Sequence, residues 1–247
     1  NYEFKVIKEK DNKSKFSSYF NLFDSIIVLA NVFKQELIDL NVKKPKIHVI
    51  TTGINISNFI EFKINPITKS CYNVLFLSRV EKNKGIEQFI KSIPAVLESY
   101  PRTIFNIAGT GSYLEKMKRH KIVDEFSENI IFHGYVKGIN KLKLIKTNDI
   151  FAFPSYYGEG CPVSVLEALA VGLPVIYTKV GALNDLLKNN SNGILIEKKD
   201  EFQLSNAIIK LIKNHKLRKS IHKCNLLLSL NFDLSIIYKK LELIYKS

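Results

Sequence analysis

Short apolar segments alternate with amphipathic segments from about residue 73 to residue 200. Residues 73–79 form a mostly apolar run, typical of a buried parallel strand. Residues 85–100 carry apolar side chains at helical spacing, among them Ile86, Phe89 and Ile90. The same alternation predicts strands over residues 103–108, 129–133, 149–153, 175–177 and 193–196, and helices over residues 112–122, 138–146 and 182–188. It indicates an α/β domain with a Rossmann-like, doubly wound parallel sheet.

The two ends of the chain differ from this repeating part. Residues 25–30 and 46–50 are predicted strands on either side of a helix over residues 31–40, and residues 51–72 read as a linker. From Asp200 onward the pattern is helical, with three helices. The last helix has apolar residues that pack either on the N-terminal region or on their own domain. The sequence leaves these two alternatives open.

The segment 155–174 is the most specific part of the chain, because Glu159 and Glu167 stand eight residues apart within it. Pro162 fits the first turn of a helix, and Gly172 and Pro174 fit its end. We therefore expect a helix that starts just after Glu159 and carries Glu167 about one and a half turns in. The two carboxylates are then at most roughly 12 Å apart, which suits a long polyol ligand with an anion at the helix N-terminus.

This segment resembles the E-x7-E signature of the retaining, GT-B-fold glycosyltransferases of family 4, also called group 1. The resemblance implies that Glu167 holds the ribose of a nucleotide and that Glu159 acts at the donor sugar. It also implies that the backbone following Glu159 contacts this sugar, through Gly160, Cys161, Pro162 and Val163. The alternative is an ordinary surface helix with solvated glutamates, but the glycines and the proline specify a particular loop before the helix.

Arg79 ends the strand predicted over residues 73–79, and Lys84 follows five residues later. Ligands of open α/β sheets bind beyond the carboxyl ends of the strands, where both side chains should lie. In the resembling family an arginine and a lysine at this spacing face the diphosphate, where they stabilise the departing negative charge during catalysis. The alternative for both side chains is a surface ion pair with Glu81 or Glu87.

Other motifs near the predicted cleft carry less information. The resemblance implies backbone contacts to the nucleobase from Gly134, Tyr135 and Val136, although a plain turn explains these residues equally well. The turn at residues 109–111 is not a G-x-G-x-x-G motif, which argues against NAD binding. Cys161 is expected to be a small steric residue and not a nucleophile, and His133 to be a hydrogen-bonded residue at a strand end.

Composition limits the class of protein. The net charge of +14 calls for an anionic partner or surface, although scattered solvated lysines explain it as well. No run of 18 apolar residues occurs, and three widely spaced cysteines favour a reducing compartment. The chain starts at Asn1 without a methionine, so we expect it to be part of a longer protein.

The resemblance implies four regions: a remnant of an N-terminal acceptor domain (1–50), a linker (51–72), a donor-binding domain (73–230) and a C-terminal helix (231–247). We expect the complete protein to be a bacterial hexosyl-type glycosyltransferase. It would transfer a sugar with retention from a UDP- or GDP-sugar to a glycan or lipid-linked acceptor in polysaccharide or glycoconjugate biosynthesis. We expect no metal and no other cofactor, and no nucleic acid as a partner. We place the complete protein in the cytoplasm or peripherally at the cytoplasmic face of a membrane, and we expect the 247 residues alone to be inactive in transfer.

Two alternatives belong to other classes. A UDP-sugar 2-epimerase-like or phosphorylase-like enzyme of the GT-B fold would use the same nucleotide cleft. A basic nucleic-acid-binding module would explain the charge, but no helix-turn-helix, zinc or aromatic-stacking motif supports it.

Overall fold

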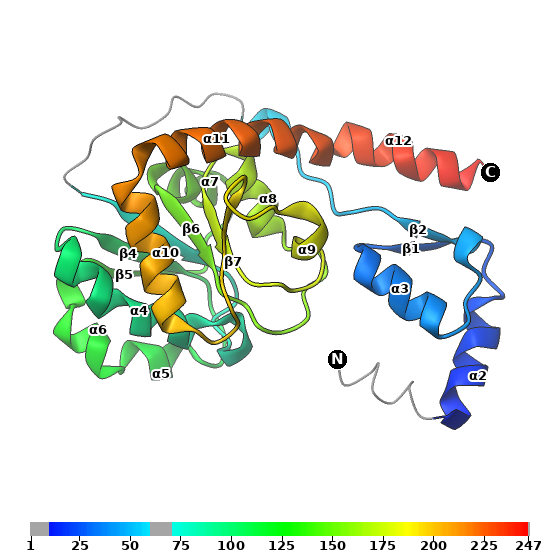
Figure 1. Ribbon diagram of the computed structural model, residues 1–247, viewed down its shortest axis with the longest axis horizontal. Helices are drawn as coiled ribbons and strands as arrows, with labels where there is room; N and C mark the ends of the chain where they lie inside the picture. Colours follow the sequence, from blue (N-terminus) through cyan, green and yellow to red (C-terminus); the bar gives the residue numbers. More distant parts are fainter. Residues whose placement is uncertain (1–9, 60–70, 247) are drawn as a thin grey trace.

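The computed structural model describes residues 10–59 and 71–246 of the chain. These residues form two parallel sheets of different size (Figure 1). The smaller sheet pairs two short strands near the N-terminus, and the larger sheet has six strands and forms the centre of the larger domain. The residues expected at the extreme N-terminus, 1–9, and residues 60–70 of the expected linker lie outside the described residues.

The six-stranded sheet has the spatial order β5-β4-β3-β6-β7-β8, and all its strands are parallel. Its strands are β3 (Asn73–Leu77), β4 (Ile104–Ala108), β5 (Ile130–Gly134), β6 (Ile150–Phe153), β7 (Val175–Tyr177) and β8 (Gly193–Leu195). The strand order reverses between the neighbours β3 and β6. Open α/β sheets bind ligands beyond the carboxyl ends of the strands at this reversal point. The predicted doubly wound, Rossmann-like fold is confirmed.

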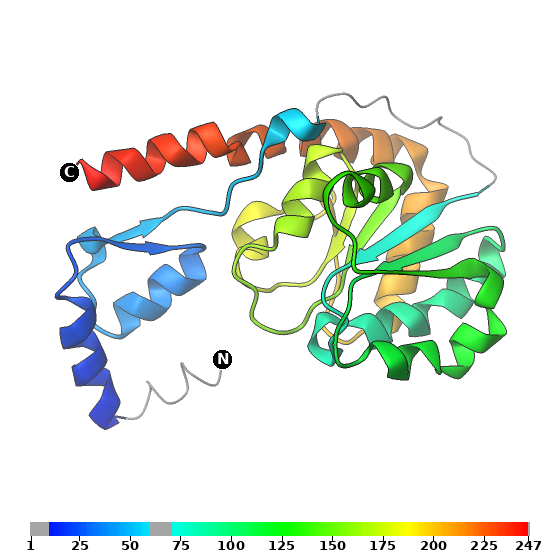
Figure 2. The same ribbon diagram turned by 180° about the vertical axis from the view of Figure 1, so that it is seen from behind.

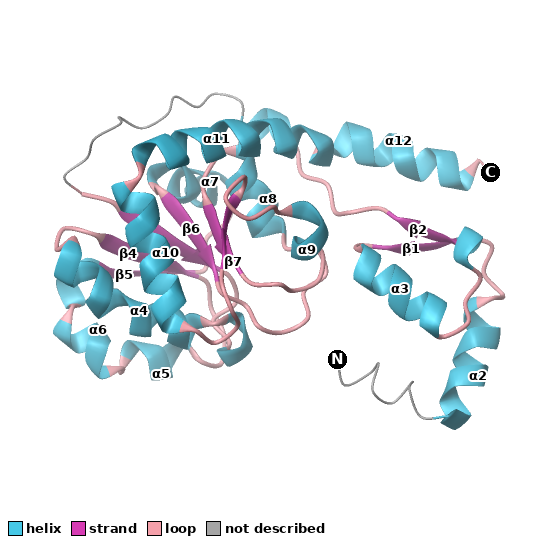
Figure 3. Ribbon diagram, in the orientation of Figure 1, coloured by secondary structure: helices cyan, strands magenta, loops and turns pink. Residues whose placement is uncertain are grey.

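Helices cover both faces of this sheet, as its apolar strands require (Figure 3). In β3, Val74 and Phe76 point into one core while Leu75 and Leu77 point into the other. The first core also receives the helices α4 (Ile86–Ser99), α5 (Leu114–Lys118), α6 (Lys121–Glu125) and α10 (Glu201–Lys213). The second receives α7 (Gly138–Thr147), α8 (Val163–Ala170) and α9 (Leu183–Leu186).

Two predicted helices differ from the observed ones. The helix expected over residues 112–122 is broken into α5 and α6, because His120 has extended backbone and its Nδ1 accepts the N–H of Ile122 at 3.3 Å. The helix of the two glutamates begins at Val163, with Pro162 as its N-terminal cap residue. Glu159 and the residues up to Cys161 therefore lie in a loop and not in the first helical turn.

The N-terminal part contains α2 (Lys10–Phe20), the strands β1 (Ile26–Val28) and β2 (Ile47–Val49), and α3 (Asn31–Asp39) between them. Leu37 and Leu40 of this part pack with Ile47 in a small core of their own. Several contacts link the part to the larger domain, among them those of Ala30, which is buried in the core on the α8 side of the sheet. The N–H of Asn31 donates to Asp185 Oδ2 at 2.6 Å, and a Cβ on Gly160 would lie 2.8 Å from Leu29 Cδ1.

The C-terminal helices α11 (His215–Ser229) and α12 (Leu234–Tyr245) run from the larger domain toward the N-terminal part (Figures 1 and 2). Near the start of α12, Ile237 is buried, and Gly53 of the expected linker lies against it. Near its end, Ile244 and Tyr245 line a cavity together with Leu22 and Phe23. The final helix thus contacts the N-terminal part.

Part of the expected linker belongs to the larger domain. A short 3-10 helix, η2 (Ile56–Phe59), follows Ile54, and the side chains of Ile54, Ile56 and Phe59 are buried in the core on the α8 side of the sheet. None of the described helices has the length and apolar character needed to cross a membrane.

Candidate functional site

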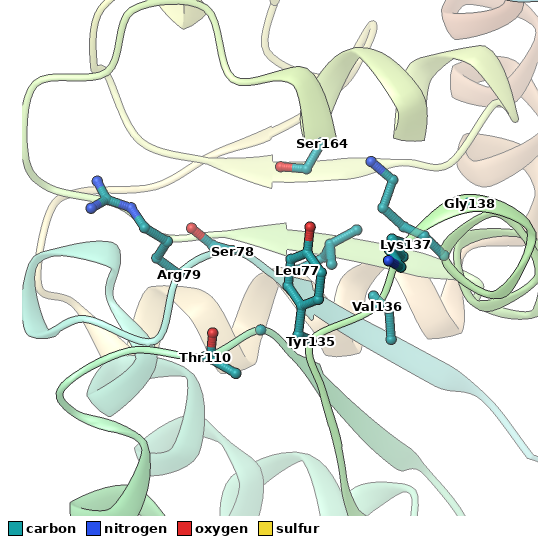
Figure 4. Close-up of a pocket in the computed structure, with 11 residues that line it drawn as sticks. Leu77, Ser78, Arg79, Thr110, Tyr135, Val136, Lys137, Gly138 and Ser164 are labelled. Carbon is teal, nitrogen blue, oxygen red and sulfur yellow. The ribbon is translucent and has the colours of Figure 1, made fainter.

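A cavity of about 500 Å³ opens beyond the carboxyl ends of β3, β4 and β5. In Figure 4, Arg79 lies at one end of this cavity and Lys137 and Gly138 lie at the other, while Ser164 faces Thr110 and Tyr135 across it. The lining residues come from three strand ends and from the first turns of α7 and α8: Leu77, Ser78, Arg79, Gly109, Thr110, Tyr135, Val136, Lys137, Gly138, Lys141 and Ser164. We call this space the central cavity.

The central cavity is suited to an anion. Arg79 and Lys137 are exposed, and the side chain of neither forms a hydrogen bond or an ion pair with another residue in the part of the chain that the structure describes. The first turn of α8 contributes Ser164 and the unpaired N–H groups found at any helix N-terminus. Two exposed positive charges and a helix N-terminus together can bind phosphate groups.

Lys84 and Glu159 form a buried ion pair beside this cavity. The Lys84 Nζ lies 2.5 Å from Glu159 Oε1, and the two residues are only 7% and 9% exposed. The Ser155 hydroxyl donates to the same carboxylate oxygen at 2.6 Å. Neither predicted alternative partner, Glu81 or Glu87, pairs with Lys84.

Close backbone contacts bring this ion pair together. Gly85, directly after Lys84, has φ +78°, and a Cβ there would lie 2.2 Å from the carbonyl oxygen of Pro154. Gly181 has φ +47°, and a Cβ there would lie 1.6 Å from the carbonyl oxygen of Glu159. The loops after β3 and β7 can therefore approach the loop before α8 only because these positions are glycine.

Glu167 lies in the second turn of α8 and is 7% exposed. Its Oε1 is 2.6 Å from Lys141 Nζ, while its Oε2 has no hydrogen-bond partner among the described residues. Burial raises the pKa of Glu167, and the hydrogen bond and charge of Lys141 oppose this rise. Glu167 lines a second cavity of about 390 Å³, which borders the central cavity at Gly138 and Lys141.

The structure brings some of the predicted site residues together and separates others. Arg79, Tyr135 and Val136 line the central cavity, and Gly134 ends the strand that leads into it. The predicted sugar-binding loop is bonded to the segment after β7, because the carbonyl oxygen of Gly160 accepts the N–H of Ala182 at 3.0 Å. Lys84, Glu159, Gly160, Cys161, Pro162 and Val163 do not line either cavity.

Cys161 and His133 have the surroundings of structural residues, as the sequence predicts. Burial raises the pKa of the Cys161 thiol, and hydrogen bonds with Thr52 act in the opposite direction. The thiol is therefore a poor nucleophile at neutral pH. His133 Nε2 lies 2.8 Å from Asn106 Oδ1, and burial lowers the pKa of this imidazole.

The sequence matches the family described as "Glycosyl transferases group 1" over residues 58–225, more than half of the chain. The chain belongs to this family.

Two curated relatives illustrate the match to the group 1 family. An uncharacterized glycosyltransferase of Methanocaldococcus jannaschii is 30% identical over 227 residues, which are 82% of this chain and 55% of the relative. The UDP-Gal:alpha-D-GlcNAc-diphosphoundecaprenol alpha-1,3-galactosyltransferase of Escherichia coli is 26% identical over 211 residues, which are 81% and 54% of the two chains. The chain thus spans about half the length of these relatives.

Solved structures agree in fold. HepE of Anabaena, solved in complex with UDP, superposes with a TM-score of 0.82 over 96% of this chain and 68% of its own, at 20% identity. TarM of Staphylococcus aureus superposes with a TM-score of 0.79 over 96% of this chain and 47% of its own, at 21% identity. At this level of identity, the likeness shows that this chain and the two solved proteins share a fold.

Several residues that line the central cavity were not predicted from the sequence, namely Thr110, Lys137, Lys141 and Ser164. Two signals point to some of them. Ser164 occupies the first turn of the signature helix, where hydroxyl groups often contact anions, and Lys137 directly follows the predicted base-binding residues. Lys141 has no such signal, because its importance depends on a contact with Glu167, which lies far away in the sequence.

Proposed function

We propose that the complete protein is a retaining glycosyltransferase of family 4. It transfers a hexosyl group from a nucleoside diphosphate sugar to a glycan or lipid-linked acceptor, in polysaccharide or glycoconjugate biosynthesis. The observation that carries this proposal is the central cavity, which combines Arg79, Lys137 and the N-terminus of α8 at the reversal point of the sheet. The described residues bind the donor.

Each part of the donor has a matching group in the structure. The diphosphate lies against Arg79, Lys137 and the first turn of α8, where charge-assisted hydrogen bonds stabilise it. The base lies on the backbone at Tyr135 and Val136, and a ribose hydroxyl donates to the free Oε2 of Glu167. The donor sugar lies at the loop of Glu159, Gly160 and Cys161, which the contacts with Gly181 and Ala182 hold in place.

The chemistry needs stabilisation of the leaving nucleoside diphosphate. As the bond from the anomeric carbon to the diphosphate oxygen breaks, negative charge grows on that oxygen, and groups already oriented toward it lower the barrier. We propose that Arg79 and Lys137 supply this charge directly and that no divalent metal is required. Lys84 joins them if the donor sugar draws Glu159 away from the ion pair. The acceptor hydroxyl would approach on the same face of the sugar, which yields retention.

The relatives support a uridine nucleotide as donor. The Escherichia coli relative is named for its use of UDP-Gal, and HepE of Anabaena was solved with UDP. The net charge of +14 supports an anionic environment, and we propose that the complete protein acts at the cytoplasmic face of a membrane on a lipid-linked acceptor.

Calorimetric titration of the chain with UDP, GDP, UDP-sugars and GDP-sugars tests the proposal. We expect saturable binding of one nucleotide class, with AMP and inorganic phosphate as controls that bind far more weakly. Product analysis by NMR with the full-length protein then tests retention. Equal affinity for AMP, or no binding of any nucleoside diphosphate, would contradict the proposed donor site.

A further inference from the structure

Lys141 stands at the border of the two cavities and lines both of them. It is the fourth residue of α7, and its side chain remains 30% exposed while the side chain of its partner Glu167 is 10% exposed. The partly exposed lysine thus reaches from solvent to a buried carboxylate. Because Glu167 is the more buried partner, most of the free-energy cost of removing charge from water falls on its carboxylate.

The contacts of Glu167 are incomplete in one specific respect. Oε1 is bound by Lys141 at 2.6 Å, and Oε2 is buried without a partner among the described residues. A buried polar atom without a partner costs stability, so its persistence next to a cavity indicates a ligand that supplies the missing donor. Lys141 and a ligand hydroxyl can therefore bind the two oxygens at the same time.

The other elements packed against α8 do not supply a competing charge. Besides α7, these elements include η2, β6, β7 and α11. Titratable side chains near them include Tyr177, whose pKa burial raises to about 12, and His222, which lies 3.2 Å from the Gly172 carbonyl oxygen. Within the described part of the chain, the ion pair of Glu167 is formed with Lys141.

We propose that Lys141 is a positioning residue that keeps the Glu167 carboxylate ionised and oriented, so that its free Oε2 accepts a ribose hydroxyl of the donor. This inference rests on the proposed nucleotide-binding function. Lys141 itself need not touch the nucleotide. Its effect is exerted through Glu167, because a charged carboxylate accepts a stronger hydrogen bond than a protonated one.

The consequence is a specific pH dependence. Burial raises the pKa of Glu167, and Lys141 opposes this rise. Removing the lysine charge therefore raises the pKa further. Because binding uses the ionised form, affinity in Lys141→Met falls as the pH drops, starting at a higher pH than in the unmodified protein. Below the pKa of Glu167 the loss approaches about tenfold per pH unit.

The experiment measures UDP affinity by calorimetry from pH 5.5 to pH 8.5 for the unmodified chain, Lys141→Met, Lys141→Arg and Lys143→Met. Lys143 is an exposed lysine on the same helix and lines neither cavity, so Lys143→Met is the matched control. We expect a shifted profile only in Lys141→Met and restoration by Lys141→Arg. A Lys141→Met profile that coincides with the unmodified one would overturn the inference while leaving the nucleotide site intact.

A second measurement does not depend on nucleotide. The side-chain carboxyl carbon of Glu167 is titrated by NMR in the unmodified chain, in Lys141→Met and in Lys141→Gln, the last serving if the methionine variant folds poorly. We expect the midpoint to move to higher pH in both variants. An unchanged midpoint would overturn the inference even if UDP binds. Absence of UDP binding to the unmodified chain, with a shifted midpoint, would instead contradict the proposed function.

Discussion

Lys84 Nζ and Glu159 Oε1 lie 2.5 Å apart although 75 residues separate them in the chain, and both side chains are almost fully buried. The pair joins the loop after β3 to the loop before α8 across the reversal point of the sheet. Ser155 adds a hydrogen bond to the same carboxylate oxygen. The pair therefore fixes the predicted sugar-binding loop before any ligand arrives.

Removing one member of this pair is expected to be costly. Lys84→Met leaves the Glu159 charge buried without its partner, and such changes cost about 3–5 kcal/mol of unfolding free energy. The double variant with Glu159→Gln should lose much less than the sum of the two single changes. Urea denaturation measures the unfolding free energies of the single and double variants. Lys91→Met, which breaks an exposed pair with Glu87, is the control and should cost less than about 1 kcal/mol.

The two glutamates of the signature should affect different parts of the donor. Glu167→Ala is expected to weaken binding of UDP itself by about 1–3 kcal/mol, because a charge-assisted hydrogen bond to the ribose is lost. Glu159→Ala is expected to leave UDP binding unchanged and to weaken only the UDP-sugar. Calorimetry with both ligands separates the effects. Equal losses for bare UDP would contradict this division between ribose and sugar.

Divalent metal should be dispensable for binding. Arg79 and Lys137 supply positive charge at the central cavity, and neither side chain forms a hydrogen bond or an ion pair with another described residue. We expect UDP affinity to be the same with EDTA and with added Mg²⁺ or Mn²⁺. Arg79→Gln, in contrast, should weaken UDP binding by about 1.5–3 kcal/mol and leave uridine binding unchanged. A strict requirement for Mg²⁺ or Mn²⁺ would show that these cations are insufficient.

Glu167 is expected to lower the unfolding free energy of the protein although it contributes to ligand binding. Its Oε2 is buried without a partner, and burial raises its pKa. Glu167→Met is therefore expected to increase the unfolding free energy at pH 7 by about 1 kcal/mol while abolishing ribose recognition. The raised pKa means that burying the Glu167 carboxyl costs less free energy when the group is protonated. The increase in unfolding free energy caused by Glu167→Met should therefore be full above this pKa and should shrink as the pH falls through it. Denaturation at several pH values measures the trend.

Local patterns were sufficient to predict most of the larger domain. Buried parallel strands such as β3 are recognisable because both of their faces are apolar, and α4 because its apolar spacing is regular. The break between α5 and α6 escaped prediction, since it depends on how the single residue His120 folds back on Ile122. Periodicity does not record such a local hydrogen bond.

The site was only partly predictable for a different reason. Arg79 and Glu167 could be found because the signature and the strand end mark their positions. The pairings of Lys84 with Glu159 and of Lys141 with Glu167 depend on how distant loops meet. The sequence suggested only the nearby carboxylates Glu81 and Glu87 as ion-pair partners of Arg79 and Lys84. In the structure Glu87 pairs with Lys91, and Glu81 accepts hydrogen bonds from Ser112.

A comparison of two glycines tests whether backbone contact controls the sugar-binding loop. Gly181 and Gly138 both have positive φ, +47° and +53°, so alanine is strained at either position. Only at Gly181 would the added Cβ collide, at 1.6 Å from the carbonyl oxygen of Glu159, whereas nothing lies within 4 Å at Gly138.

Gly138→Ala should therefore cost only the backbone strain, about 1 kcal/mol. Gly181→Ala should cost more, because the loop of Glu159 must move. We expect Gly181→Ala to weaken UDP-sugar binding more than UDP binding, as the displaced loop faces the sugar. Denaturation and calorimetry on both variants give the comparison. If Gly181→Ala weakens UDP binding and UDP-sugar binding equally, close packing behind Glu159 does not govern the position of the sugar.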